Sequence, residues 1–241
     1  MDHWFFVHIM KTAGTTFRRM LTETPAVPVY PTSEELAANP RRMYLPVAQL
    51  ISRIESGEID LSDRQFLCGH YSANLPERLP GTWRTVTVLR DPVQRTLSMI
   101  AHHHYRQGPL KRFFKPSISR YLADEAFVEG RIRDYQTKVF ALPSTGHVNR
   151  PYAIDDAGFA RAKTRLLEMD FVGLTEQFGP SIALFEAISG RRFAPPAFFN
   201  KSRGYSVTDA EVARIRSLVA RDIELYELAR ERLRTSIAAA A

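Results

Sequence analysis

Short apolar runs of strand length alternate along this chain with longer segments in which apolar residues recur at helical spacing. The strand-like runs lie at residues 4–10, 66–68, 84–89 and 171–174. Helical spacing predicts helices over residues 14–21, 47–54, 92–104, 117–128, 131–141, 155–167, 178–188 and 208–235. Strands that alternate with helices in this way predict an α/β fold, with a parallel sheet flanked by helices on both faces.

Local chemistry marks where two of these helices begin. Asp91 followed by Pro92 supplies an N-cap and a proline at the first helical position. Thr208 and Glu211 have the spacing of a capping box, which predicts one long helix over residues 208–235. The proline-containing stretches 25–40 and 191–207 are predicted loops.

Length and composition favour one globular domain over residues 1–241. The chain is 44% hydrophobic and 24% charged, which excludes wholesale disorder. Its single cysteine, Cys68, excludes an internal disulfide and any zinc site with two thiolates, and it indicates a reducing compartment. No apolar run is long enough to span a bilayer and the amino end does not resemble a signal peptide, so we expect a cytoplasmic protein.

The net charge of +7 predicts an anionic partner, which could be nucleic acid, an anionic lipid or a small ligand that carries phosphate or sulfate. The charge is concentrated in one region. Between Asp91 and Asp124 there are six basic residues and no acidic one.

The turn at residues 11–16 follows a predicted strand and opens a predicted helix. Such a helix end presents free N–H groups to an anion, and Lys11 adds a charge. Ala13 and Gly14 allow close approach of the backbone, and Thr15 and Thr16 add hydroxyl donors. The lysine precedes the glycine, unlike G-x-x-x-x-G-K-[ST], which disfavours a nucleoside-triphosphate loop. An ordinary strand-to-helix turn remains the alternative.

A second turn repeats the arrangement. Arg90 ends a predicted strand, the next helix begins at Asp91-Pro92, and Ser98 lies two turns further on. An arginine at a strand's carboxyl end points into the crevice where open α/β sheets bind ligands. Alternatively Arg90 pairs with a neighbouring acid and Ser98 is only an exposed helix residue. Two anion sites would suit a ligand with phosphate groups at both ends.

Both turns resemble motifs of the sulfotransferases that use 3′-phosphoadenosine 5′-phosphosulfate (PAPS). His8 to Phe17, H-I-M-K-T-A-G-T-T-F, resembles their 5′-phosphosulfate loop. Val88 to Arg95, V-L-R-D-P-V-Q-R, with Ser98 resembles their 3′-phosphate motif. The carbohydrate branch, which includes heparan and uronyl 2-O-sulfotransferases and bacterial relatives, is the most similar. Residues 171–176 and 200–203 also resemble family segments, whereas Met10 replaces the family's usual proline.

The resemblance implies a sulfotransferase architecture with a P-loop-like parallel sheet, and transfer of a sulfuryl group from PAPS to a hydroxyl of a sugar, glycolipid or secondary metabolite. It implies no metal, and it implies a bacterial cytoplasmic enzyme. Lys11 would be the cation at the leaving oxygen and His70 the general base. The residues that the resemblance assigns to PAPS are Lys11, Thr12, Ala13, Gly14, Thr15, Thr16, Phe17, Arg90, Ser98, Lys201 and Arg203.

On the acceptor side, we expect a helical insertion over residues 105–155. Tyr135, Gln136 and Arg112 are its candidate substrate contacts. The basic stretch 106–120 would bind an anionic acceptor, touch a membrane surface transiently, or form a solvated loop. The run His102 to His104 cannot chelate one ion from a regular helix, so we interpret it as a cationic helix end. We interpret His8 as a structural strand residue.

Two other classes of function remain at this stage. A P-loop-type nucleotide kinase would need a magnesium-holding carboxylate near Lys11 and would prefer ATP to PAPS. A non-catalytic nucleic-acid-binding protein would show a steep salt dependence, but no known nucleic-acid-binding motif supports it, and we expect no nucleic-acid partner.

Overall fold

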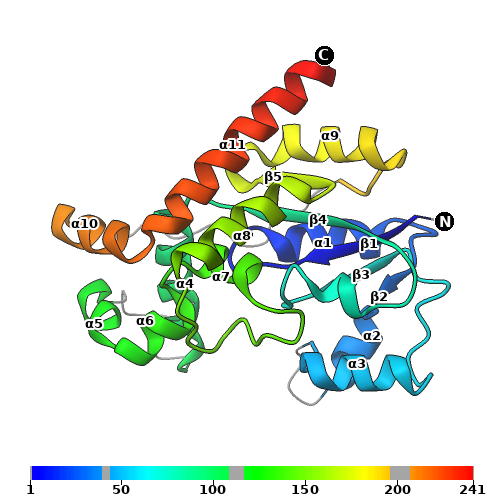
Figure 1. Ribbon diagram of the computed structural model, residues 1–241, viewed down its shortest axis with the longest axis horizontal. Helices are drawn as coiled ribbons and strands as arrows, with labels where there is room; N and C mark the ends of the chain where they lie inside the picture. The colour runs from blue at the N-terminus through cyan, green and yellow to red at the C-terminus, as the bar shows by residue number, and fades with distance from the viewer. Residues whose placement is uncertain (1, 40–43, 109–116, 196–206, 241) are drawn as a thin grey trace.

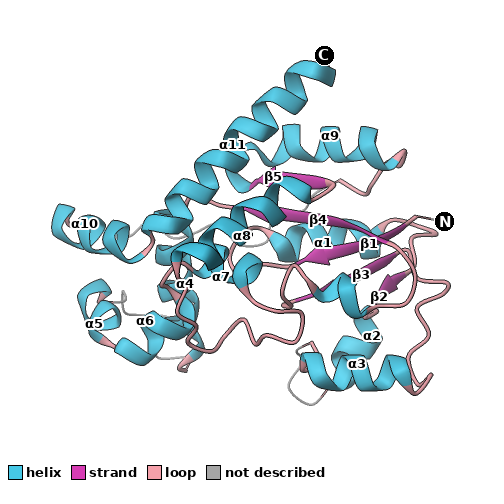
Figure 2. Ribbon diagram, in the orientation of Figure 1, coloured by secondary structure: helices cyan, strands magenta, loops and turns pink. Residues whose placement is uncertain are grey.

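The computed structural model describes residues 2–39, 44–108, 117–195 and 207–240. In this part of the chain, five parallel strands form one sheet in the order β2-β3-β1-β4-β5 (Figure 1). The strands are β1 (His3–Val7), β2 (Val29–Tyr30), β3 (Phe66–Gly69), β4 (Trp83–Leu89) and β5 (Phe171–Leu174). Helices lie on both faces of the sheet (Figure 2), so the predicted fold class is confirmed.

Strand β1 occupies the centre of the sheet, between β3 and β4. The chain builds β2 and β3 on one side of β1 and then places β4 and β5 on the other. The carboxyl ends of β1 and β4 therefore lie where the strand order changes direction, and ligands of open α/β sheets bind at this kind of crevice.

The helices of the described residues are mostly short. They are α1 (Gly14–Glu23), α2 (Ser33–Ala38), α3 (Val47–Glu55), α4 (Pro92–Arg106), α5 (Ile118–Ala123), α6 (Glu125–Arg131), α7 (Tyr135–Ala141), α8 (Asp156–Glu168), α9 (Phe178–Ser189), α10 (Asp209–Leu218) and α11 (Ala220–Ala240), with the 3-10 turns η1 (Leu75–Arg78) and η3 (Thr175–Gln177). None of them is long and apolar enough to cross a membrane.

The two expected helix starts are confirmed. The Asp91 carboxylate accepts a hydrogen bond from the Gln94 amide at 2.8 Å, and Pro92 is the first residue of α4. Thr208 and Glu211 form the capping box that opens α10. These local signals suffice because each bond joins residues three positions apart.

Four of the expected elements differ from the structure, and three of them lie before residue 142. The predicted loop 25–40 contains β2, a two-residue edge strand recognisable only from its pairing with β3, and also α2. The predicted helix over 117–128 is divided at Asp124, which ends α5 and caps α6. The predicted helix over 131–141 begins only at Tyr135, because Asp134 has a left-handed backbone with φ of 41°.

The predicted helix over 208–235 is two helices that meet at Val219. Val219 is fully buried in a second apolar cluster formed by α4, α5, α6 and α10. The expected 105–155 insertion therefore packs against α10 from the carboxyl-terminal part of the chain. The principal core surrounds the sheet.

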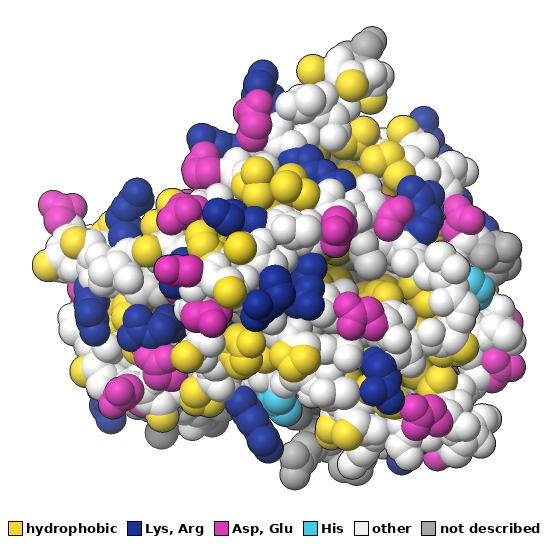
Figure 3. Space-filling view, viewed as in Figure 1, with side chains coloured by type: hydrophobic (Ala, Val, Ile, Leu, Met, Phe, Trp, Pro, Cys, Tyr) yellow, Lys and Arg dark blue, Asp and Glu magenta, His cyan; other side chains and the backbone are white. Residues whose placement is uncertain are grey.

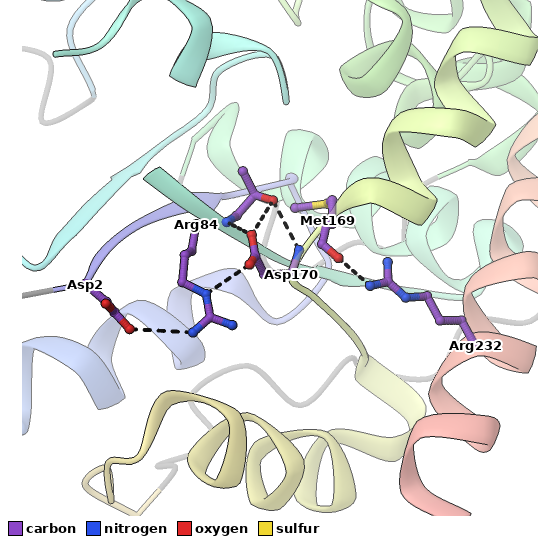
Figure 4. Close-up of polar contacts among 6 residues, drawn as sticks. Asp2, Arg84, Met169, Asp170 and Arg232 are labelled. Carbon is purple, nitrogen blue, oxygen red and sulfur yellow. Dashed lines mark hydrogen bonds and ion pairs between the residues drawn. The ribbon is translucent and has the colours of Figure 1, made fainter. Parts of the chain in front are cut away.

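A polar network holds together the amino-terminal ends of strands β4 and β5 (Figure 4). Asp170, just before β5, accepts hydrogen bonds from Arg84 Nε at 2.9 Å and the Thr85 amide at 2.8 Å. From α11, Arg232 donates to the carbonyl of Met169. The network therefore lies at the end of the sheet opposite the carboxyl ends of the strands.

Candidate anion-binding and catalytic site

The turn between β1 and α1 is tightly curled. Lys11 and Ala13 both have left-handed backbones, with φ of 72° and 62°. A side chain makes this conformation unfavourable, so it occurs where the surrounding structure imposes it. Such positions are often found at ligand sites. Thr12 donates from its hydroxyl to the Ile9 carbonyl at 3.0 Å, which holds the curl closed.

The amino end of α1 is available to an anion. In the described part of the chain no side chain caps it, and its first turn contains no acidic residue. The Phe17 N–H donates to the Ala13 carbonyl at 3.0 Å, whereas the N–H groups that precede it and the positive end of the helix dipole are directed toward the turn. Thr15 is exposed and Thr16 is buried, while Phe17 packs in the core against Phe6.

Packing against His8 requires a glycine at position 14, in addition to the close approach of a ligand that glycine allows. A Cβ atom at this position would lie 2.1 Å from Cδ2 of His8. The imidazole of His8 thus rests directly on the first residue of α1, which leaves no room for a side chain there.

The two predicted anion sites meet in the structure. Arg90, immediately after β4, donates from its guanidinium to the Lys11 carbonyl at 3.3 Å. The Arg90 Nε atom is buried and has no hydrogen-bond partner among the described residues. Burial lowers the pKa of Lys11, and the charges of Arg90 and Arg95 lower it further. An anion bound here would relieve this mutual repulsion of three cations.

Arg95, which is not among the predicted site residues, connects α4 to the same turn. Its side chain is fully buried, and burial lowers its pKa to about 10. It donates to the carbonyls of Met10 at 3.2 Å and Arg131 at 2.9 Å, and its guanidinium lies 4.0 Å from the centre of the Tyr135 ring. Its place in the V-L-R-D-P-V-Q-R motif was the available signal.

Ser98 shares a face of α4 with Arg95, whose guanidinium donates to the Met10 carbonyl at this turn. It follows Arg95 by three residues and precedes His102 by four, so the three share one face. Burial lowers the pKa of His102 to about 4, and Lys11 is the charge that lowers it most. Ser98 is partly buried on this face.

The interpretation of the run His102 to His104 as a cationic helix end was wrong for His102 and His103. Burial lowers the pKa of His102 and of His103, so both are neutral at pH 7. His104 is buried, with Nδ1 3.3 Å from the Tyr121 hydroxyl. The rings of His103 and His104 contact Tyr121 of the second apolar cluster, and for His102 and His103 burial outweighs attraction to the helix dipole.

His70 follows β3 and is prepared to accept a proton. Its Nδ1 lies 2.5 Å from the His8 carbonyl. A carbonyl oxygen only accepts hydrogen bonds, so the proton of neutral His70 sits on Nδ1 and Nε2 keeps its lone pair. Burial lowers the pKa of His70 to about 4, which keeps the ring neutral at pH 7.

His8 lies just beyond β1 and orients this imidazole. Its carbonyl fixes the tautomer of His70, and the two ring centres are 4.3 Å apart. His8 Nδ1 lies 3.0 Å from the Tyr44 hydroxyl, and burial raises the pKa of that hydroxyl. Burial also lowers the pKa of His8 well below its usual value. The residue interpreted as structural is thus part of the site's support.

Glu176, in the segment 171–176, links the second turn to α11. Its carboxylate accepts hydrogen bonds from the Asp91 amide at 3.1 Å and from the Tyr226 hydroxyl at 2.9 Å. Burial lowers the pKa of Arg90, and Glu176 is the strongest of the charges that oppose this shift. This carboxylate helps to keep Arg90 charged inside the fold.

Neither Tyr135 nor Gln136 is exposed to an acceptor, which contradicts the expectation for them. Both are buried, the Tyr135 hydroxyl donates to Asn149 Oδ1 at 2.8 Å, and the Gln136 amide is bonded to the backbone of Arg90. The expected contacts Arg112, Lys201 and Arg203 lie outside the described residues, as do positions 109–116 of the basic stretch.

The likeness of this chain to known proteins is found among solved structures. No protein-family model and no curated protein matches this sequence. Among solved structures, the chain is similar to a sulfotransferase from Alicyclobacillus acidocaldarius, with 18% sequence identity over 94% of this chain and 99% of that one, at a TM-score of 0.44. A likeness of this size does not assign an activity, so the function has to be inferred from the site itself.

Proposed function

We propose that this protein is a PAPS-dependent sulfotransferase that acts on a hydroxyl group. The observation that carries the proposal is the contact between Arg90 and the Lys11 carbonyl, which unites two strand-to-helix turns at neighbouring strand ends. One turn offers an uncapped helix end and Lys11, and the other offers Arg90 and Ser98. This arrangement suits a nucleotide with anionic groups at both ends.

The residues fit the reaction as follows. The 5′-phosphosulfate binds to the turn formed by residues 12–17, through the N–H groups that precede Phe17 and with Lys11, and the 3′-phosphate binds to Arg90 and Ser98. His70 Nε2 takes the proton of the acceptor hydroxyl as its oxygen bonds to sulfur. The bond from sulfur to the bridging oxygen breaks, and Lys11 stabilises the charge that develops on the leaving phosphate. The products are a sulfated acceptor and adenosine 3′,5′-bisphosphate (PAP).

The resemblance to the carbohydrate branch favours a sugar hydroxyl as acceptor, with glycolipids and secondary metabolites as further members of the same class. We assign Lys201 and Arg203 to the nucleotide on that resemblance alone. The basic stretch 106–120 is the proposed contact for an anionic acceptor or a membrane surface.

The surroundings of Lys11 support this reading over a nucleotide kinase. The charges that shift the pKa of Lys11 are the cations Arg90 and Arg95, whereas a kinase needs a carboxylate there to hold magnesium.

The surface bears on the nucleic-acid-binding alternative. On the face shown in Figure 3, basic and acidic side chains are interspersed, unlike the continuous basic stripe expected of a nucleic-acid-binding surface.

The deciding experiment is isothermal titration with PAP, AMP and ATP. AMP is PAP without its 3′-phosphate, so the difference in affinity between the two measures the second turn alone. Binding of PAP that is much tighter than binding of AMP is the expected result. A preference for ATP would overturn the proposal in favour of the kinase, and salt-sensitive binding of nucleic acid without PAP binding would favour the third class.

A further inference from the structure

The carboxyl-terminal helix α11 is joined to α7 by an exchange of helix caps. Asp222, in the first turn of α11, accepts hydrogen bonds from the Thr137 amide at 2.7 Å and the Gln136 amide at 3.1 Å, at the start of α7. Asp134, just before α7, accepts bonds from the Arg221 amide at 3.0 Å and the Asp222 amide at 3.2 Å. Each aspartate thus satisfies the free N–H groups of the other helix.

The side chain of Gln136 continues from this exchange to the site. Its Oε1 accepts a hydrogen bond from the Arg90 amide at 3.0 Å, and its Nε2 donates to the Arg90 carbonyl at 2.8 Å. Gln136 has no exposed surface, and its own amide is held by Asp222. Both backbone groups of Arg90, just beyond the last residue of β4, are therefore held by one buried amide.

The direction of the Arg90 guanidinium depends on that backbone. It reaches the Lys11 carbonyl at 3.3 Å, and its Nε has no partner among the described residues. A guanidinium recognises phosphate through fixed, paired hydrogen bonds, so a small rotation of its backbone would misalign them.

We propose that Gln136, fixed by Asp222, is a positioning residue that aligns Arg90 with the 3′-phosphate of the nucleotide. This inference rests on the proposed function. It also assigns a task to the start of α11, since removal of the Asp222 carboxylate would loosen Gln136 and, through it, Arg90.

The first test is Gln136→Met, which keeps the length of the side chain and removes both bonds to Arg90. The affinity for PAP is expected to fall about 10-fold to 100-fold, the range of one charge-assisted hydrogen bond, while the affinity for AMP stays unchanged. Arg90→Ala sets the limit, because it removes the guanidinium itself. Unchanged binding of AMP also reports that the nucleotide site of the variant is folded.

Gln65→Met is the matched control. Gln65 is also a buried glutamine, but it lies at the amino end of β3, where its side-chain amide faces Arg191. Its removal is expected to leave the ratio of the two affinities as in the wild type. If Gln136→Met does not fold, Gln136→Glu replaces it, since an ionised carboxylate cannot donate to the Arg90 carbonyl.

A double-mutant cycle tests whether Asp222 acts through Gln136. Asp222→Asn is expected to lower the preference for PAP in the wild type and to have no further effect in the Gln136→Met background. Additive effects would overturn the link between the two residues.

The remaining outcomes separate the inference from the proposed function. If Gln136→Met keeps the wild-type ratio while Arg90→Ala loses it, the inference is wrong and the proposed function stands. Equal losses for PAP and AMP would give Gln136 only a general structural role. A wild-type protein that does not distinguish PAP from AMP would overturn the proposed function first.

Discussion

His70 shows how one main-chain contact determines the chemistry of a side chain. The bond to the His8 carbonyl leaves Nε2 as the basic atom, and burial keeps the ring neutral. A histidine in this state can accept a proton at pH 7, although its low pKa makes it a weaker base than a free imidazole.

Replacement of this histidine tests its role directly. His70→Ala is expected to lower kcat by about 10²–10⁴-fold, the usual contribution of a general base, because the acceptor proton loses its destination. The affinity for PAP, measured by titration, should change little. A large loss of PAP binding would remove His70 from the role of base.

The buried histidines His8 and His70 also predict how stability depends on pH. Burial lowers the folded-state pKa of His8 and His70 below the value of about 6.5 expected in the unfolded chain. The unfolded chain therefore binds more protons in acid, and stability is lost as pH falls from about 6.5 toward 4. Thermal unfolding between pH 7 and 4 should show this loss, and His70→Gln should make it shallower. An unchanged slope in that variant would contradict the assigned protonation state.

At the scale of elements, strand β1 and helix α1 are joined by a turn with two left-handed residues, Lys11 and Ala13. The first residue of α1, Gly14, has no room for a side chain. The His8 ring occupies the space that a Cβ of residue 14 would need. Because the same ring lies beside His70, this packing joins the anion-binding turn to the candidate base.

Gly14→Ala is expected to destabilise the fold by about 1–3 kcal/mol through overpacking and to weaken PAP binding. Gly179→Ala is the matched control. Gly179 lies in α9, where an added Cβ would meet no atom within 4 Å, so this substitution should be neutral or stabilise by up to about 1 kcal/mol. Urea unfolding and PAP titration measure both effects. Equal effects of the two substitutions would show that the His8 contact is unimportant.

At the scale of the whole molecule, the carboxyl ends and the amino ends of the parallel strands have different roles. The carboxyl ends of β1, β3 and β4 lead to Lys11, His70 and Arg90, whereas the amino ends of β4 and β5 carry the Asp170 network (Figure 4). Helix α11 extends between them (Figure 1), from Asp222 beside the site to Arg232 at the amino ends.

Asp170→Ala should therefore separate stability from function. Loss of the bonds to Arg84 and the Thr85 amide is expected to lower the free energy of unfolding by about 1–3 kcal/mol, with PAP affinity unchanged. Glu58→Ala is the control, because it removes an exposed ion pair with Arg53. This substitution should change the free energy of unfolding by less than about 1 kcal/mol. A loss of PAP affinity in Asp170→Ala would show that the two ends of the strands are coupled.

The sequence predicted those elements whose interactions are local. The β-branched run 84–89 became β4, and Asp91 and Thr208 cap their helices as expected, because these signals act over a few residues. It also predicted both turns of the site. It missed β2, which exists as a strand only through its pairing with β3.

What the tertiary structure decided depends on residues far apart in the chain. The apolar spacing over 208–235 continues through Val219, but burial of that residue and the Asp134 cap divide the helix there. Gln136 carries no local sign that its amide holds Arg90, 46 positions away. The sequence by itself determined the elements and the residue types at the two turns, since these depend on neighbours along the chain. Only closure of the sheet brought Arg90 to the Lys11 carbonyl and His70 to the carbonyl of His8, because such contacts form only when distant strands pair.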